Sequence, residues 1–175
     1  VGGDAAGMSA ASKFKRAAPE RDVVVFERGE WVSYGACGLP YYVKGEVDSL
    51  DDLVSVTPEA FVEERDVDLR TGHEVVAIDR DARTVTVEGP EGTVEQPYED
   101  LLVATGASAV EPPLTGMDLD GVFTMHDMDT AAALRRFLGL ETPAVEAAPP
   151  AAGAEGSDEA LGAVEGVAVV GGGYV

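Results

Sequence analysis

The chain has 175 residues, of which 45% are hydrophobic and 6% aromatic, and its 33 acidic and 12 basic residues give a net charge of -21. This composition excludes collagen-like, coiled-coil and largely disordered proteins, and it predicts one ordinary domain of about 100–200 residues. The acidity argues against nucleic acid or an anionic membrane as a partner, because like charges repel.

The first elements predict a βαβ unit whose first strand is missing from the chain. The chain opens on Val1-Gly2-Gly3, a glycine turn of the kind that follows a strand. Small and apolar residues at helical spacing predict a helix over 5–18. The apolar run at 22–27 predicts a buried parallel strand. A second strand with a glycine turn stands at 167–175, so we expect a fragment cut inside two equivalent motifs.

The middle of the chain predicts short elements. Pro40 and three glycines indicate irregular structure or a short helix over 33–47. Thr57 as a cap, followed by Pro58, predicts a helix start. The other predicted elements are a β-meander from strands at 74–78, 84–88 and 93–96, a buried strand at 101–104, and a helix at 131–138 capped by Asp127 or Asp129.

Together these elements predict an α/β, three-layer, Rossmann-like domain with a β-meander over residues 1–140. Residues 141–166 are rich in Ala, Pro, Gly and Glu, which predicts a flexible acidic linker. Residues 167–175 then read as the start of a second Rossmann domain. No apolar run reaches the roughly 18 residues of a membrane span.

The glycine turn carries a dinucleotide-binding pattern. Gly2, Gly3, Ala5, Ala6 and Gly7 let the backbone approach a pyrophosphate at a helix N-terminus, and an acid 20 residues beyond Gly7 can bind a ribose; that acid is Glu27. Asp4 stands where the strict fingerprint has its middle glycine. The alternative interpretation is an ordinary tight βα turn.

Two further features favour a dinucleotide. The segment 101–107 (LLVATGA) is a hydrophobic strand followed by a turn at Thr105 and Gly106 that can bring backbone amides to the same ligand. The second glycine turn, within 167–175, indicates a second nucleotide site. Two such sites in one chain predict a flavin that exchanges electrons with a nicotinamide.

Cys37 is the only cysteine, so the chain forms no internal disulfide, which fits a reducing cytoplasm. A lone cysteine is often a small, buried packing residue. The surrounding SYGACGLP is polar and glycine-rich, however, and a helix start at this point would favour the thiolate. We therefore predict that Cys37 is a redox nucleophile.

The segments GGDAAGMSAA, SYGACGLPYY, TPEAFVEERDVDLRTGHEV and LLVATGA, together with Glu27, resemble the single-cysteine branch of the pyridine nucleotide-disulfide oxidoreductases. The resemblance is greatest to coenzyme A-disulfide reductases and NADH oxidases. It implies an FAD domain that carries the cysteine, a second Rossmann domain for NADH or NADPH, and a homodimer. Electrons would pass from the nicotinamide through FAD to Cys37. The oxidised form of Cys37 would be a mixed disulfide with a small thiol or a sulfenic acid.

The resemblance also implies site residues. Peroxidase and water-forming oxidase members carry a histidine where this chain has Ala5, which favours the coenzyme A-disulfide branch, although Ala36 replaces an Asn frequent there. The predicted FAD-binding residues are Gly2, Gly3, Ala5, Ala6, Gly7, Glu27, Arg28, Val76, Thr105 and Gly106. The predicted coenzyme A-binding residues are Ser9, Lys13, Arg16, Ser33 and Arg65.

The prediction is therefore a FAD-dependent NAD(P)H:disulfide oxidoreductase that reduces coenzyme A disulfide. One alternative is an NADH oxidase that reduces oxygen, and another is a non-catalytic flavin-binding electron carrier. His73 and His126 lack metal-ligand spacing, so no metal is expected. The acidity, spread along the chain, predicts adaptation to high salt, with a merely soluble acidic protein or a basic partner as alternatives.

Overall fold

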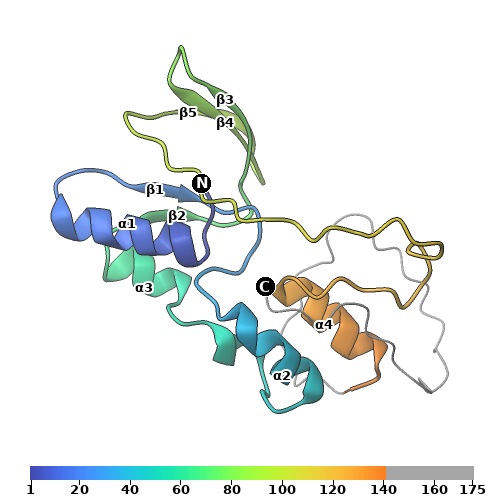
Figure 1. Cartoon of the computed structure of the whole chain (residues 1–175). Coiled ribbons are helices and arrows are strands. Elements are labelled where there is room, and N and C mark those ends of the chain that lie inside the picture. Colours follow the sequence, from blue (N-terminus) through green and yellow to red (C-terminus); the bar gives the residue numbers. More distant parts are fainter. Residues whose placement is uncertain (141–175) are drawn as a thin grey trace.

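The computed structural model describes residues 1–140. Its α-helices are α1 (Ala5–Ala17), α2 (Leu39–Lys44), α3 (Pro58–Glu63) and α4 (Met128–Phe137), and its short 3-10 helices are η1 (Ala36–Gly38) and η2 (Leu50–Leu53). Its strands are β1 (Val24–Phe26), β2 (Asp68–Arg70), β3 (Glu74–Asp79), β4 (Thr84–Gly89) and β5 (Gly92–Pro97). Helices α1 and α3 lie on one side of β1 and β2, and the sheet of β3, β4 and β5 rises on the other (Figure 1).

A parallel pair of strands forms the centre of the fold. Strand β1 pairs in parallel with β2, with Val25 opposite Leu69. Helix α1 covers this pair with its small apolar face. The cluster beneath it consists of Met8, Ala11, Val25, Val32, Phe61 and Val67. Each large side chain buried there contributes about 1.5–3 kcal/mol of transfer free energy, which fixes α1 over the strands.

The meander β3-β4-β5 is an antiparallel sheet. Its central strand alternates in burial: Val85 and Val87 are buried, whereas Thr84 and Thr86 are half-buried. The two valines pack against Phe26 of β1. This contact attaches the meander to the face of the parallel pair opposite α1.

Helices α2 and α4 form a second packed unit. Leu39 and Tyr42 of α2 cluster with Met128 and Ala131 of α4. Helix α4 begins where Asp127 caps it: Asp127 Oδ1 accepts a hydrogen bond from the Thr130 N–H at 2.8 Å. The 3-10 turn that contains Cys37 leads directly into α2. This packing therefore stabilises the end of residues 33–38, which we call the cysteine loop.

The sequence predictions are largely confirmed, with differences at single elements. The first helix, the meander and the Thr57 and Asp127 caps are observed. The predicted strand at 101–104 is wrong. Its backbone forms hydrogen bonds with only one residue, Val1: the Val1 N-terminus donates to Leu102 O, and the Ala104 N–H donates to Val1 O. Two bonds to a single residue are too few for a strand ladder. Strand β2 was not predicted. The linker and second-domain predictions lie outside the described residues.

Candidate functional site: a dinucleotide cradle beside an exposed cysteine

The glycine turn fits closely between its neighbours. The Gly2 N–H donates to Phe26 O at 2.9 Å, which joins the turn to the end of β1. Gly2 has a positive φ of 104°, and a Cβ added there would collide with Ala104 O. A Cβ added to Gly7 would collide with Gly2 O. Only glycine therefore allows this close approach of strand, turn and helix.

Glu27 closes the turn with its side chain. Oε2 accepts a hydrogen bond from the Gly3 N–H at 2.6 Å, and Oε1 accepts one from the Gly29 N–H at 2.8 Å. Each carboxylate oxygen keeps a second lone pair, so the group can still accept bonds from hydroxyls of a ligand. The predicted acid is thus fixed at the end of β1, beside the glycine turn.

A cavity of about 290 Å³ opens beside this carboxylate. The predicted FAD-binding residues that line it are Gly2, Glu27, Arg28, Thr105 and Gly106. Val75 lines the cavity, whereas the predicted Val76 is 48% exposed on β3 and is not among the lining residues. Gly3 and Gly7 are buried next to it, and Ala5 and Ala6 are exposed in the first turn of α1.

A second, larger groove of about 690 Å³ runs between α1, β1 and the segment 96–102. Of the predicted site residues, only Gly2 and Gly7 line it. The smaller cavity is therefore the one that the dinucleotide pattern describes.

The N-terminus of α1 is suited to an anion. No side chain caps this 13-residue helix, so the N–H groups of its first turn are left to a ligand. Together with the helix dipole, such groups bind phosphate. The uncapped helix, the three close-packed glycines and the ribose-type acid fit a dinucleotide such as FAD.

Cys37 lies in the η1 turn that leads into α2, and its side chain is exposed. It is therefore not a packing residue within the described core. Two hydrogen bonds hold the preceding segment against the glycine turn: Ser33 N–H donates to Gly3 O at 3.1 Å, and Tyr34 N–H donates to Asp4 Oδ1 at 3.2 Å. Gly2, Gly3, Gly7, Glu27 and the first turn of α1 form the cradle. The cysteine loop is thus hydrogen-bonded to the cradle, which no local sequence pattern had indicated.

The phenol of Tyr34 lies in a negatively charged environment where the cysteine loop meets the glycine turn. Burial, followed by the negative charges of Asp4, Asp127, Glu27 and Asp129, raises the pKa of its phenol to about 12. These four carboxylates are therefore the negative charges that act on the Tyr34 phenol.

The predicted coenzyme A residues divide into two groups. Ser9, Lys13 and Arg16 are exposed along α1 at spacings of four and three residues, which places them on one face of the helix. Arg65 lies beside the same helix, because its guanidinium donates to Ser12 Oγ at 2.9 Å. Ser33 is apart from them, in the segment that contacts the glycine turn.

The two histidines each bond a backbone carbonyl. His73 Nδ1 lies 2.6 Å from Thr71 O, and His126 Nε2 lies 2.8 Å from Ala107 O. Within residues 1–140 no three His, Cys, Asp or Glu side chains gather as they would around a metal ion. In the same range, no helix has the length and apolar character needed to cross a membrane.

The fold and the cradle define a dinucleotide-binding α/β domain. Its family follows from comparison: the chain belongs to the pyridine nucleotide-disulphide oxidoreductases, which it matches over residues 1–175. Enzymes of this family use FAD and NAD(P)H. The family resemblance, the fold class and the cofactor prediction from the sequence are confirmed.

Three relatives describe the range of activities. The chain is 38% identical over its whole length to the NAD(P)H sulfur oxidoreductase (CoA-dependent) of Pyrococcus abyssi, and it covers 34% of that protein. It is 33% identical, over 79% of its length and 31% of the relative, to the coenzyme A disulfide reductase of Staphylococcus haemolyticus. It is 31% identical, over 93% of its length and 36% of the relative, to the NADH oxidase of Methanocaldococcus jannaschii. The chain thus spans about a third of each relative.

A solved structure agrees with this assignment. The NAD-dependent persulfide reductase of A. fulgidus superposes with a TM-score of 0.74 at 36% identity. The match covers 78% of this chain and 26% of that one. The fold described here therefore corresponds to one part of a larger enzyme architecture.

Proposed function

We propose that the protein is a FAD-dependent NAD(P)H:disulfide oxidoreductase that reduces coenzyme A disulfide, or a related low-molecular-weight disulfide, through Cys37. One observation carries the proposal: the sole cysteine is exposed on a loop hydrogen-bonded to the dinucleotide cradle. The relatives named for coenzyme A disulfide and CoA-dependent sulfur chemistry support the substrate class.

The cradle residues would hold the cofactor. The N–H groups at the start of α1 would bind its diphosphate, and Glu27 would accept hydrogen bonds from ribose hydroxyls. The cavity residues Arg28, Thr105 and Gly106 would complete the contacts. When bound, FAD supplies two-electron transfer from NAD(P)H.

Cys37 would carry the substrate chemistry. Its thiolate attacks one sulfur of the disulfide, the substrate S–S bond breaks, and the first thiolate leaves and takes a proton. The mixed disulfide on Cys37 then receives two electrons that originate from NAD(P)H. Its S–S bond breaks, the second thiol leaves with a proton, and the Cys37 thiolate is restored. One disulfide thus consumes two electrons and two protons.

The cations beside α1 would recognise the nucleotide part of coenzyme A. Lys13 and Arg16 are exposed, and Arg65 is held next to them by its bond to Ser12. Guanidinium and ammonium groups bind phosphates strongly. In a chain of net charge -21 they offer the local positive charge that an ADP-phosphate ligand needs.

The main alternative is an NADH oxidase, which the relative from Methanocaldococcus jannaschii favours. Ala5, at the glycine turn, has only a methyl side chain and so no polar group to assist a sulfenic acid on Cys37, which supports the disulfide substrate. In the other alternative, a non-catalytic flavin-binding electron carrier, Cys37 is only a packing residue, which its exposed side chain does not favour. A long-wavelength charge-transfer absorption between the thiolate and the flavin would argue against that alternative.

The test is Cys37→Ser in the protein that contains this chain. Serine is nearly isosteric, so the fold, FAD binding and reduction of the flavin by the nicotinamide should persist. Reduction of coenzyme A disulfide should fall by orders of magnitude, because a hydroxyl neither ionises near neutral pH nor forms a mixed disulfide. Turnover of coenzyme A disulfide near the wild-type rate would refute the proposal.

The whole protein would contain a second domain and form a dimer. Residues 141–166 would link the FAD domain to an NAD(P)H domain beginning at 167–175. The complete enzyme would be a cytoplasmic homodimer, and residues 1–175 alone would be inactive.

A further inference from the structure

Asp4 does not act as its position suggests. It is the N-cap residue of α1, with an extended backbone at φ -99° and ψ -159°. An aspartate there ordinarily accepts a hydrogen bond from an N–H in the first turn of its own helix. The Asp4 side chain makes no such bond, and its Oδ1 accepts instead from the Tyr34 N–H at 3.2 Å. The acid thus serves a segment 30 residues away.

The segment that Asp4 contacts is held in an unfavourable conformation. Ser33 has a φ of +50°, in the left-handed region that non-glycine residues rarely adopt. Its backbone is fixed on both sides, because its N–H donates to Gly3 O and its carbonyl accepts from the Ser55 N–H at 2.8 Å. The bond from Tyr34 to Asp4 immediately follows and fixes the direction in which the chain leaves this residue.

Cys37 follows directly along this path. After Tyr34, the Gly35 N–H donates to Leu53 O and the Gly38 N–H to Gly35 O, both at 2.8 Å. Only Gly35 and Ala36 separate Tyr34 from the cysteine. We therefore expect a displacement of Tyr34 to move the Cys37 thiol as well.

We infer that Asp4 is a positioning residue for Cys37: its carboxylate fixes Tyr34 and so sets the thiol relative to the cofactor cradle. The inference rests on the proposed redox role of Cys37. The same orientation of the carboxylate leaves the N–H groups of the first turn of α1 uncapped for a diphosphate. One acid in place of a fingerprint glycine thus serves both the thiol and the cradle.

Hydrogen exchange of the Tyr34 amide tests the bond directly. In Asp4→Ala the amide should exchange at least about tenfold faster, because a charged acceptor is lost. In Asp4→Asn the remaining amide oxygen should keep exchange close to wild type. Asp118→Ala, which removes an exposed acid elsewhere, should have no effect. The Gly35 amide, bonded to Leu53, is the internal control.

The alkylation rate of Cys37 tests the consequence. Since it is the only cysteine, the rate of reaction with iodoacetamide reports this thiol alone. We expect a change of about threefold or more in Asp4→Ala and recovery of the wild-type rate in Asp4→Asn. If Asp4→Ala does not fold, Asp4→Gly replaces it, because glycine suits this position of the fingerprint.

Two results would overturn the inference. One is unchanged exchange of the Tyr34 amide in Asp4→Ala, or in Asp4→Gly where that variant replaces it. The other is faster exchange with an unchanged alkylation rate, which would make Asp4 a structural residue only. Neither measurement uses turnover, so failure of the disulfide reductase proposal in Cys37→Ser would be recognised separately.

Discussion

At the scale of single residues, Glu27 combines a structural role with the predicted ligand role. Its two oxygens already accept bonds from the Gly3 and Gly29 N–H groups, so the carboxylate shapes the turn before any cofactor binds. A mutation there would therefore act on the fold as well as on the ligand. The two effects can be separated by measuring stability without FAD.

We expect Glu27→Ala to lower the free energy of unfolding of the FAD-free protein by about 1.5–3 kcal/mol, because bonds to a charged acceptor are lost. FAD should also dissociate more readily. Urea denaturation and the flavin retained on gel filtration measure the two effects. Glu30→Gln, an exposed neighbour, should change stability by less than about 0.5 kcal/mol. Tight FAD retention in Glu27→Ala would contradict the placement of the cofactor.

Tyr34 gives a pH dependence with a defined sign. Its pKa is raised from 10.0 to about 12, first by burial and then by the charge of Asp4. Above pH 10 the unfolded chain ionises this phenol while the folded chain does not. Its contribution to stability is thus complete below pH 10 and is lost as the pH rises through 12.

The measurement is a near-ultraviolet titration of the phenolates in wild type and Tyr34→Phe. The chain has five tyrosines, so the difference between the two curves isolates Tyr34. A midpoint near 12 is expected, and Asp4→Asn should lower it. A difference curve centred near the ordinary value of 10 would show that the phenol is in contact with solvent.

At the scale of elements, Arg135 joins α4 to α2. The side chain is 7% exposed, and its guanidinium donates to Tyr42 O at 2.9 Å and to Val47 O at 3.1 Å. It also lies 4.6 Å above the Tyr42 ring. A buried cation on α4 thus donates to one carbonyl of α2, at Tyr42, and to one in the segment after it, at Val47.

Arg135→Met keeps the apolar stem but removes these donors and leaves buried carbonyls without them. We expect a loss of about 3 kcal/mol in the free energy of unfolding, measured by urea denaturation. Arg136→Met makes the same change at the exposed neighbouring position and should cost less than about 0.5 kcal/mol. Equal effects of the two substitutions would mean that Arg135 contributes only general helix stability.

The sequence predicted the elements with strong local signals. The glycine turn, the caps at Thr57 and Asp127, and the alternating strands of the meander follow from patterns within a few residues. Strand β2 has no such signal: its sequence, DLR, is short and mostly charged, and only its pairing with β1 makes it a strand. Conversely, the apolar segment 101–104 is not a strand, because its backbone forms hydrogen bonds with Val1 alone.

The candidate site shows the same division. Gly2, Gly7 and Glu27 were predictable because the fingerprint fixes their spacing. The contact between Asp4 and Tyr34 was not, since 30 residues separate the two and the local rule for Asp4 predicts a helix cap. Long-range contacts of this kind depend on the packing of α1 and the cysteine loop together.

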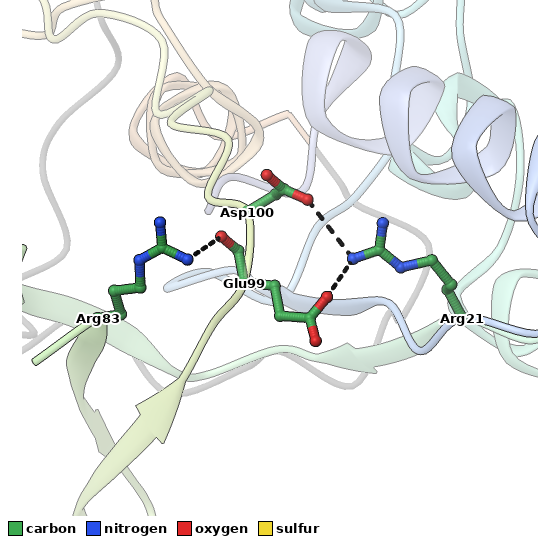
Figure 2. Close-up of polar contacts among 4 residues, drawn as sticks. All are labelled: Arg21, Arg83, Glu99 and Asp100. Carbon is green, nitrogen blue, oxygen red and sulfur yellow. Dashed lines mark hydrogen bonds and ion pairs between the residues drawn. The ribbon is translucent and has the colours of Figure 1, made fainter.

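At the scale of the whole molecule, excess negative charge dominates the electrostatics. Acidic residues outnumber basic residues by 33 to 12. The attractive pairs lie mostly at the surface: Arg21 meets Glu99 at 2.6 Å and Asp100 at 3.5 Å, and both acids are 83% exposed (Figure 2). Such pairs contribute at most about 1 kcal/mol each. Because the net charge is -21, we expect repulsion among the remaining acids to outweigh these pairs.

Salt screens both the attraction within ion pairs and the repulsion among acids. The larger of these two energies therefore decides whether salt raises or lowers the melting temperature. At molar ionic strength the Debye length falls to about 3 Å, which removes most repulsion between exposed carboxylates. We expect the melting temperature to rise markedly from low to molar KCl, as the predicted adaptation to high salt requires. The rise should be larger than that in sucrose of equal osmolality, because sucrose acts by exclusion without screening charge.

The variant Arg21→Gln tests how screening acts on a surface ion pair and on the net charge. This variant loses the pairs with Glu99 and Asp100 and adds one net negative charge. It should melt below wild type at low KCl and approach wild type in molar KCl, because screening weakens both the lost attraction and the added repulsion. A wild-type melting temperature that stays flat or falls with KCl would remove the salt-adaptation hypothesis. A basic protein partner would then become the better account of a net charge of -21.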